Sequence, residues 1–357
     1  MFFSSRVLLG SFLAFISGFG LILNFLTLIP VFRLAFIQRK NQVYIIAFFN
    51  ICTDIVQLSL ATFYLAPAII SHSFLVADQK KERWTLFLGS IFMFCWYFET
   101  VTQMVMAVNR FVVICLQRHN FFNFLSTLLI FVALTPFCFL AMYTSQYTNP
   151  CCSFLFDQEI LGWSYYEIPG VHNYSNDLDL PLNMTSTIVS GLCYVCIYIN
   201  IHKGTPVENK ARRKRDIRYA VQFSVILFFY AFVWIFFRIF PEIVKGQDIE
   251  WFFLIPLCFT INCSSNALIY LGFNSEVQNN SSPECFKTFL ITYFKNSQDC
   301  NYSPQNTVKR TSTTIQSISG TGAPTPTPTQ NLQVPIWSTR RIQPFRGIRM
   351  QDAERNV

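Results

Sequence analysis

Long apolar runs separated by short polar segments make up most of this 357-residue chain. Seven of the runs are long enough to cross a hydrocarbon layer of ~30 Å as α-helices, each of which needs about 20 residues. A helix also satisfies its own backbone hydrogen bonds in lipid, so no other structure is expected inside these runs. The predicted helices are residues 7–32, 43–70, 84–115, 124–143, 182–201, 217–240 and 251–271.

The fifth run decides the number of crossings. Polar side chains in its first half weaken its apolar character: Asn183, Thr185, Ser186, Thr187 and Ser190. Without this helix both termini would lie on the same side of the membrane. The prediction of seven crossings therefore depends on residues 182–201.

The composition favours a membrane protein. Hydrophobic residues make up 52% of the chain and charged residues 13%, whereas about 25% of an ordinary soluble domain is charged. The 40 phenylalanines exceed what a water-soluble core of this size can bury, and lipid accepts the remaining aromatic surface. The sequence predicts an all-α, seven-transmembrane helix bundle.

The net charge of +8 is distributed unevenly between the two sides of this bundle. If the N-terminus is extracellular, the cytoplasmic loops carry most of the basic residues: Arg33, Arg39, Lys40, Arg110, Arg118, Lys203, Lys210, Arg212, Arg213, Lys214, Arg215 and Arg218. The outer segments carry Arg6, Lys80, Lys81, Arg83 and Lys245. This bias predicts an extracellular N-terminus and a cytoplasmic C-terminus. Since the basic residues form no single face, no nucleic-acid partner is expected.

Segments outside the helices carry further expectations. Asn173 and Asn183 begin glycosylation sequons on the predicted outer side, although Asn183 stands close to the membrane. The first apolar run is too long for a cleavable signal sequence and is expected to act as a signal anchor. Residues 276–357 are predicted to form a mostly disordered cytoplasmic tail, because residues 311–330 are rich in Ser, Thr, Pro and Gly.

Two short motifs stand at predicted inner helix ends. Asn109-Arg110-Phe111 ends the third helix, and Asn266-Ala-Leu-Ile-Tyr270 ends the seventh. They resemble the Asp/Glu-Arg-Tyr and Asn-Pro-x-x-Tyr motifs of rhodopsin-like G-protein-coupled receptors. Together with the basic start of the sixth helix, they resemble most closely the nematode serpentine chemoreceptors of class X (Srx), over residues 7–275. The resemblance implies a receptor that transduces an external small-molecule signal to a heterotrimeric G-protein. It also implies a location in the plasma membrane, with sensory cilia as a candidate site.

The resemblance also implies roles for single residues. Arg110 would contact the G-protein when the sixth helix moves, and Trp234 would repack when ligand binds. Asn109 stands where the family has an acid, so Asp216 is a candidate partner for Arg110, or else it only offsets its basic neighbours. Thr85 stands near the family position of an outer cysteine, which leaves the pairing of the loop residues Cys151 and Cys152 open.

A set of polar residues is expected at membrane depth, where each charge costs ~2.5–3.5 kcal/mol on insertion scales. Asp54 and Glu99 are the carboxylates, and Asn24, Asn262 and Asn266 should lie at a similar level. By resemblance this is the place of a sodium ion, which carboxylate and amide oxygens can coordinate. The alternative is a hydrogen-bonded network that fixes helix packing without an ion.

The ligand is expected to meet the upper part of the third helix, at Phe92, Trp96 and Tyr97, and the acidic second outer loop. No nucleophile constellation or phosphate loop is apparent, so the protein is not expected to be an enzyme or to need a cofactor other than a possible sodium ion. The alternative functions are a ligand-gated channel or transporter that uses Asp54 and Glu99 for permeation, and a non-signalling membrane chaperone. Cys285 is a candidate for palmitoylation.

Overall fold

The structure, a computed structural model, describes residues 2–118, 121–148, 151–203, 210–244 and 249–280, and the side chains of 2–4, 210–216 and 275 lie outside this description. These residues all belong to the first of the two units into which the chain divides, residues 1–303. The predicted tail beyond residue 280, including Cys285, lies outside the described residues.

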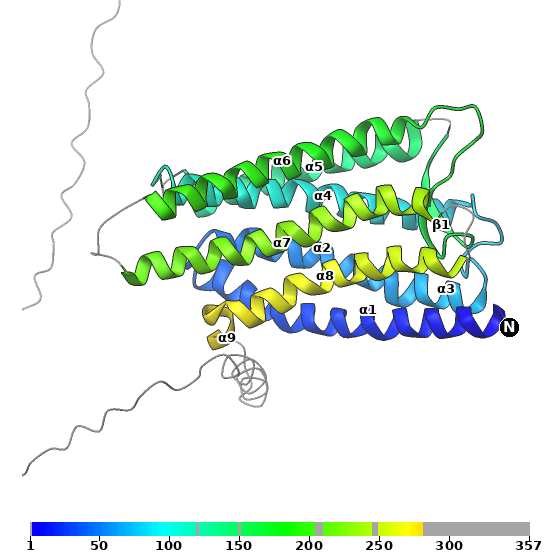
Figure 1. Cartoon of the computed structure of the whole chain (residues 1–357), viewed down its shortest axis with the longest axis horizontal. Helices are drawn as coiled ribbons and strands as arrows, with labels where there is room; N and C mark the ends of the chain where they lie inside the picture. Colours follow the sequence, from blue (N-terminus) through cyan, green and yellow to red (C-terminus); the bar gives the residue numbers. More distant parts are fainter. Residues whose placement is uncertain (1, 119–120, 149–150, 204–209, 245–248, 281–357) are drawn as a thin grey trace, which may run out of the picture. The chain divides into compact units, whose positions relative to one another are not determined.

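Long helices that run along a common axis form the bundle (Figure 1). The label η marks a single turn of π-helix, or of 3-10 helix in η5. In chain order the elements are α1 (Phe2–Phe32), η1 (Arg33–Ile37), α2 (Val43–Leu60), η2 (Ala61–Leu65), α3 (Ala66–Ser71), α4 (Arg83–Ile114), α5 (Phe124–Tyr143), η3 (Thr144–Thr148), β1 (Phe154–Asp157), β2 (Gly162–Tyr165), α6 (Tyr174–Lys203), α7 (Lys210–Ile243), η5 (Ile249–Phe253), α8 (Leu254–Phe273) and α9 (Ser275–Asn280).

The described part of the chain holds 7 spans long and apolar enough to cross a membrane. They are Ser5–Ile37, Val43–Ser71, Arg83–Ile114, Phe124–Thr148, Tyr174–Lys203, Ile217–Ile243 and Ile249–Phe273. Each overlaps one predicted helix, and the predicted seven-helix fold class is confirmed. The predicted boundary between bundle and tail at residue 275 is followed by one more short helix, α9.

The fifth span begins at Tyr174, earlier than the predicted residue 182. Asn173 Oδ1 accepts a hydrogen bond from the Asn176 backbone nitrogen at 3.3 Å, which caps the first turn of α6. Three of the polar side chains that weaken the apolar pattern, those of Asn183, Ser186 and Ser190, are buried against neighbouring helices, whereas Thr185 is exposed. Hydrogen bonds across helix interfaces make such residues tolerable at membrane depth.

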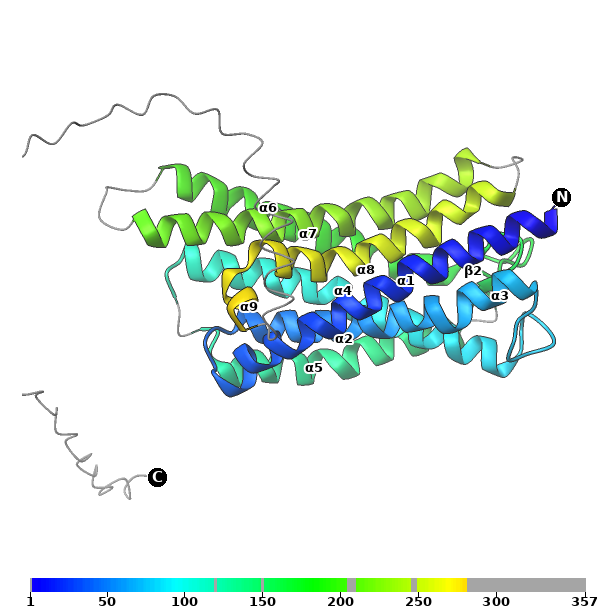
Figure 2. The same cartoon turned by 90° about the horizontal axis from the view of Figure 1, so that it is seen from below.

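Helix α4 lies at the centre of the bundle, where it packs against α2, α5, α6 and α7 (Figure 2). Within the most apolar stretch of each span, 72% of α4 is buried but only 22% of α5. The outward face of α5 therefore presents large apolar side chains, among them Leu129, Val132 and Phe139. An apolar surface of this extent is unusual for a soluble monomer and suits acyl chains.

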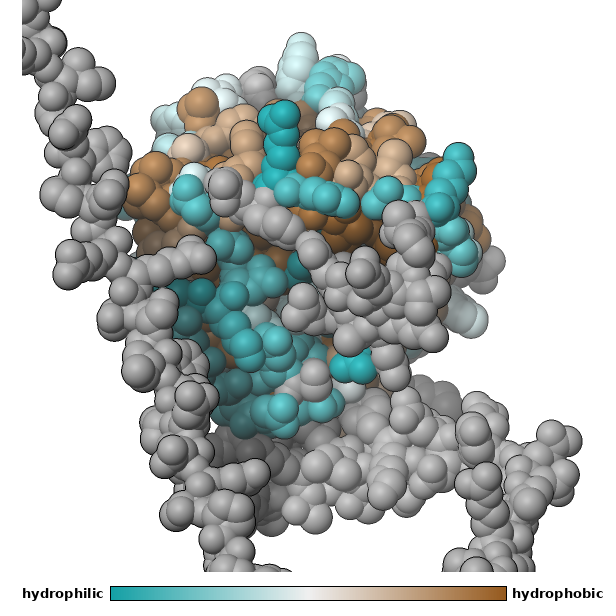
Figure 3. All heavy atoms as spheres, turned by 90° about the vertical axis from the view of Figure 1, so that its left-hand side faces the viewer, coloured by the Kyte–Doolittle hydropathy of each residue, from teal (hydrophilic) through white to brown (hydrophobic). Residues whose placement is uncertain are grey.

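The two ends of the bundle differ. The N-terminus and the β hairpin lie at one end, and α9 lies at the other (Figures 1 and 2). They are called the outer end and the inner end, respectively, after the orientation predicted from the sequence. Hydrophilic residues gather on the α9 end, which faces the viewer in Figure 3, whereas the neighbouring flank of the bundle is largely apolar. The start of α1 and the end of α8 are therefore on opposite ends, as an odd number of crossings requires.

An antiparallel hairpin of β1 and β2 covers the outer end, with Phe154 opposite Tyr165 and Asp157 opposite Gly162. From the sequence, this segment is expected only as an acidic loop. Gly89 allows the hairpin to sit directly on α4, because a Cβ at this position would come within 2.0 Å of the Phe154 carbonyl oxygen. A larger residue there would displace the hairpin.

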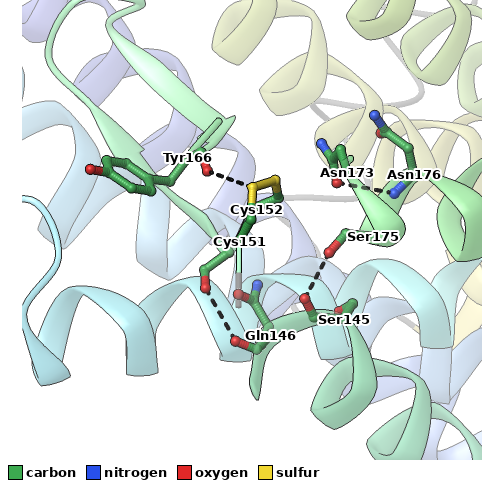
Figure 4. Close-up of a disulfide and its surroundings, with 9 residues drawn as sticks. Ser145, Gln146, Cys151, Cys152, Tyr166, Asn173, Ser175 and Asn176 are labelled. Carbon is green, nitrogen blue, oxygen red and sulfur yellow. Dashed lines mark hydrogen bonds between the residues drawn. A yellow bond between two sulfur atoms is a disulfide. The ribbon is translucent and has the colours of Figure 1, made fainter. Parts of the chain in front are cut away.

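Cys151 and Cys152 are joined to each other by a disulfide between adjacent residues (Figure 4). Cys151 Sγ lies 3.8 Å from the Tyr166 carbonyl oxygen. Because these two cysteines pair with each other, the disulfide does not connect the loop to α4. Thr85 is buried near the outer start of that helix. The question that the sequence left open is answered by a local bridge.

Candidate functional site

Two carboxylates meet at the buried centre of the bundle. Asp54 on α2 and Glu99 on α4 are both 0% exposed. One carboxylate oxygen of each and the Cys263 sulfur on α8 lie within 4.8 Å of one another. Asn266 Nδ2 donates to Asp54 Oδ2 at 2.9 Å, and Asn262 Nδ2 donates to Glu99 Oε1 at 3.1 Å. The four residues expected from the sequence therefore converge on one site.

Further polar residues extend this central site, and of these only Asn24 was expected from the sequence. Asn50 Nδ2 donates to Asp54 Oδ2 at 3.2 Å, and Gln103 Nε2 donates to Asn50 Oδ1 at 3.3 Å. Asn24 Nδ2 donates to the Cys263 carbonyl oxygen at 3.1 Å, which joins α1 to α8. Asn50 lies one helical turn before Asp54, and this spacing could have identified it from the sequence as a neighbour of the carboxylate.

Oxygen atoms in the central site remain able to bind a ligand. Among the described residues, no hydrogen-bond partner is found for Oδ1 of Asp54, Asn266 or Asn24, and all three side chains are buried. A buried polar atom left unpaired costs about 1–3 kcal/mol. Carboxylate and amide oxygens are ligands for hard cations, so the donor set fits a cation, and two adjacent buried carboxylates also fit a shared proton.

Arg110 is buried at the inner end of α4, with 4% of its surface exposed. Its guanidinium carbon lies 4.6 Å from the ring centroid of Tyr219 and 5.0 Å from that of Phe223, both on α7. No hydrogen-bond partner for Arg110 Nε or Nη2 is found in the described part of the chain. The contacts that hold this guanidinium are therefore cation–π contacts.

The predicted partner of Arg110, Asp216, has its side chain outside the described residues, so that pair stays a prediction. Of the other motif residues, Asn109 is buried beside Arg110 and Phe111 is half-buried. Tyr270 on α8 is also buried, and its ring centroid lies 6.3 Å from that of Phe223. The two motifs thus flank the same inner segment of α7.

A second layer of contacts surrounds this inner end. The Tyr44 and Tyr219 hydroxyls lie 3.5 Å apart, and the Tyr44 hydroxyl donates to Glu276 Oε2 at 2.8 Å. Lys40 Nζ lies 3.5 Å from Glu276 Oε1. These interactions connect the start of α2 with α7 and α9 close to Arg110.

Tyr230 on α7 joins three helices in the middle of the bundle. Its hydroxyl donates to Asn183 Oδ1 on α6 at 2.6 Å and lies within hydrogen-bond distance, 3.0 Å, of the Thr100 hydroxyl on α4. Trp234, the expected mobile aromatic, lies one turn further out, where its Nε1 donates to Thr187 Oγ1 at 2.9 Å. Tyr230 is fully buried and Trp234 is half-buried.

The structure contradicts the prediction that Asn183 is glycosylated. The side chain is 2% exposed and is held inside the bundle by Tyr230 and Thr100, which leaves no room for a glycan. Asn173 lies at the outer end, just before α6, and glycosylation there stays a prediction.

A cavity of about 50 Å³ opens between the outer halves of α4, α6, α7 and α8 and the hairpin. More than half of the residues that line it are aromatic, including Phe92, Trp96, Trp163, Trp234 and Phe259. The ring centroids of Phe92 and Trp163 lie 5.1 Å apart, and those of Phe92 and Phe259 lie 4.9 Å apart. The result is a continuous aromatic wall.

The sequence prediction for this cavity is only partly met. Phe92 and Trp96 line it, but Tyr97 is not among its lining residues. Tyr97 follows Trp96 by one position and therefore points about 100° away around the helix. The hairpin contributes Trp163, which the sequence did not reveal because its place depends on tertiary packing.

Polar groups in the cavity gather at Asp179 on α6. Its Oδ1 accepts hydrogen bonds from Trp96 Nε1 at 3.2 Å and from Asn183 Nδ2 at 2.8 Å. Burial, and then the charge of Asp179, raise the pKa of Tyr165 well above its ordinary value, so this phenol stays protonated and can donate a hydrogen bond. Arg238 also lines the cavity, and its Nη1 donates to Asn176 Oδ1 at 2.6 Å.

Comparisons with known proteins agree with this architecture. Residues 14–274 match the family described as serpentine type 7TM GPCR chemoreceptor Srx. Among solved structures, the crystal structure of squid rhodopsin is similar, with a TM-score of 0.64 and 12% sequence identity over 85% of this chain and 93% of that chain. At this identity the likeness concerns the fold. No curated protein matches the sequence.

Proposed function

Because the chain belongs to the serpentine type 7TM GPCR chemoreceptor Srx family, we propose that it passes an external small-molecule signal to a heterotrimeric G-protein. One observation carries the proposal. Helix α7 lines the outer cavity with Trp234 and, at its inner end, covers Arg110 with Tyr219 and Phe223. A displacement of this one helix therefore changes both ends of the molecule.

The proposed mechanism is a shift between two packings of α7. A ligand that binds the cavity better in one packing favours that packing by its difference in affinity. Tyr230 connects α7 to α4 and α6, so the bundle centre takes part in the change. When the inner segment of α7 moves away, the guanidinium of Arg110 loses its ring contacts and becomes available to a cytoplasmic partner.

The proposal includes a location and an orientation. The receptor lies in the plasma membrane, with its N-terminus outside and its C-terminus in the cytoplasm, in accordance with the distribution of basic residues. We further propose that the Asp54–Glu99 site holds a sodium ion. The unpaired oxygens of Asp54 and Asn266 support a bound cation there.

The function is tested by expressing the full chain, with a tag after Val357, in cells that contain a G-protein reporter, and by applying a panel of volatile and water-soluble odorants. We expect at least one compound to raise G-protein turnover, and the tag to bind antibody only after permeabilisation. An ionic current without turnover would replace the proposal with the channel alternative. Staining of intact cells would reverse the orientation.

Replacing Tyr219 with leucine is expected to raise G-protein turnover in the absence of ligand. The substitution removes a cation–π contact to Arg110 worth about 0.5–2 kcal/mol, which shifts the packing equilibrium by roughly 2- to 30-fold. Tyr219→Phe retains the ring and is the matched control, with basal turnover close to wild type. Equal basal turnover in the two variants would show that the ring does not restrain the inactive packing.

A further inference from the structure

We infer that the outer cavity takes a small organic cation, a protonated amine whose ammonium group lies against Asp179 and the aromatic wall. The inference rests on the proposed function in that this cavity is taken as the place where the signal is received. It adds the chemical class of the ligand.

The charges around the cavity favour a cation. Among the described lining residues, Asp179 is the only carboxylate and Arg238 the only basic side chain. Asp179 accepts side-chain hydrogen bonds from Trp96, Asn183 and Tyr165, which are all neutral donors. An ammonium group would supply the positive charge that these donors lack, through a charge-assisted hydrogen bond.

Arg238 is placed differently from Asp179. Its side chain is exposed at the rim, and its Nη1 is directed to Asn176. Asp179 instead extends inward, to the indole nitrogen of Trp96 on the central helix. Arg238 interacts electrostatically with Asp179 but from the rim, and no hydrogen bond joins the two side chains among the described residues. The inner part of the cavity therefore has negative character, and the rim has positive character.

The aromatic wall is the second, independent observation. Trp96 lies beside Tyr230 and Phe259, with ring centroids 5.7 Å and 6.1 Å away, and its edge faces Asp179. Tryptophan faces attract organic cations most strongly among aromatic side chains. A carboxylate beside this aromatic wall therefore selects an alkylammonium group over a neutral group of the same size.

The size of the cavity limits the ligand. A volume of about 50 Å³ holds only a few water-sized bodies, since each needs roughly 10–15 Å³ by the same measure. The ligand is therefore a short-chain amine and not a peptide or a lipid.

The experiment measures thermal unfolding of the purified full-length receptor in detergent, without G-protein, in the presence of n-butylamine, n-butanol or butyrate. These probes share one alkyl chain and differ in the head group. We expect the apparent affinity for butylamine to exceed that for butanol by at least about tenfold, and butyrate to bind most weakly. Stronger stabilisation by butyrate, lost in Arg238→Gln, would overturn the inference in favour of an anion at the rim.

Two variants locate the effect. Asp179→Asn keeps an oxygen acceptor for Trp96 and Asn183 but removes the charge, and should lower the affinity for butylamine at least about tenfold without changing that for butanol. Asp177→Asn makes the same change on the same helix at an exposed residue that pairs with His172, and should bind all probes as the wild type does. Unchanged butylamine binding in Asp179→Asn would overturn the assignment.

The remaining outcomes are also decisive. If Asp179→Asn does not fold, the ranking of the three head groups in the wild type alone decides the ligand class. Failure of butylamine to stabilise the wild type at any soluble concentration would overturn the inference. Stabilisation by butylamine together with no G-protein turnover for any compound would leave the ligand class standing and reject the proposed function, so the two failures are distinguishable.

Discussion

Ligand-stimulated G-protein turnover is expected to fall by about 10- to 100-fold when Arg110 is replaced with alanine. Arg110 is a buried guanidinium at the inner end of the bundle, and it is restrained there by aromatic rings of α7. Its Nε and Nη2 atoms are buried and have no hydrogen-bond partner among the described residues, so in the proposed mechanism they can donate to acceptors on a partner once α7 has moved away. Hydrogen bonds to a charged group are worth about 1.5–3 kcal/mol, which corresponds to this range of turnover.

The matched control is Arg118→Ala, which removes an exposed basic residue from the same inner region. It should retain wild-type turnover, apart from a small change that increases at low salt. Surface expression and stabilisation by a cavity ligand are measured in both variants, because a loss of folded receptor would also reduce turnover. Wild-type turnover in a well-expressed Arg110→Ala receptor would refute the coupling role of this residue.

The second large effect concerns stability. Asp54→Ala is expected to lower the midpoint of thermal unfolding by about 5–15 °C, because it removes the acceptor of both Asn50 and Asn266 and each buried donor left unpaired costs about 1–3 kcal/mol. Asp54→Asn preserves the shape and one acceptor oxygen, so its midpoint should fall less. Asp78→Ala, at an exposed residue of the first outer loop, is the control and should unfold as the wild type does.

The same variants separate the two hypotheses for the central site. If a sodium ion binds there, replacing potassium chloride with sodium chloride at constant ionic strength raises the wild-type midpoint, since a ligand of the folded state stabilises that state. The increase should be absent in Asp54→Asn. A wild-type midpoint that is the same in both salts would exclude the sodium ion and leave a hydrogen-bonded network, with or without a shared proton.

The fold could be predicted from the sequence because each crossing helix needs a long apolar run, and this requirement is local. The start of α6 could not be predicted in this way. Hydropathy scores Asn183 and Ser186 as unfavourable whether they face lipid or a neighbouring helix. In the structure both face α4, where Ser186 Oγ donates to the Thr100 carbonyl oxygen at 2.7 Å. Partners of this kind are decided by tertiary packing.

The charged residues of the candidate site could be predicted from their residue type and their depth in the membrane. Asp54 and Glu99 stand out in apolar helices, and helix geometry places them at the same level. The ring contacts of Arg110 could not be predicted, because α7 contains so many aromatic residues that Tyr219 and Phe223 are not distinguished by type. The hairpin was missed for a similar reason, since Phe154 and Trp163 form a wall only after the strands pair on α4.

The disulfide between Cys151 and Cys152 has a consequence for how the outer end works. A bond between neighbouring residues fixes no distance between helices. Within the described part of the chain, the hairpin is therefore held over the cavity by noncovalent contacts, including the stacked rings of Phe92 and Phe154 and the ion pair of Lys80 with Asp157. Covers of this type open on timescales of the order of microseconds to seconds. Under the proposed function, opening of this cover would limit how fast a ligand enters and leaves the cavity, and a hairpin that packs more loosely would release the ligand sooner.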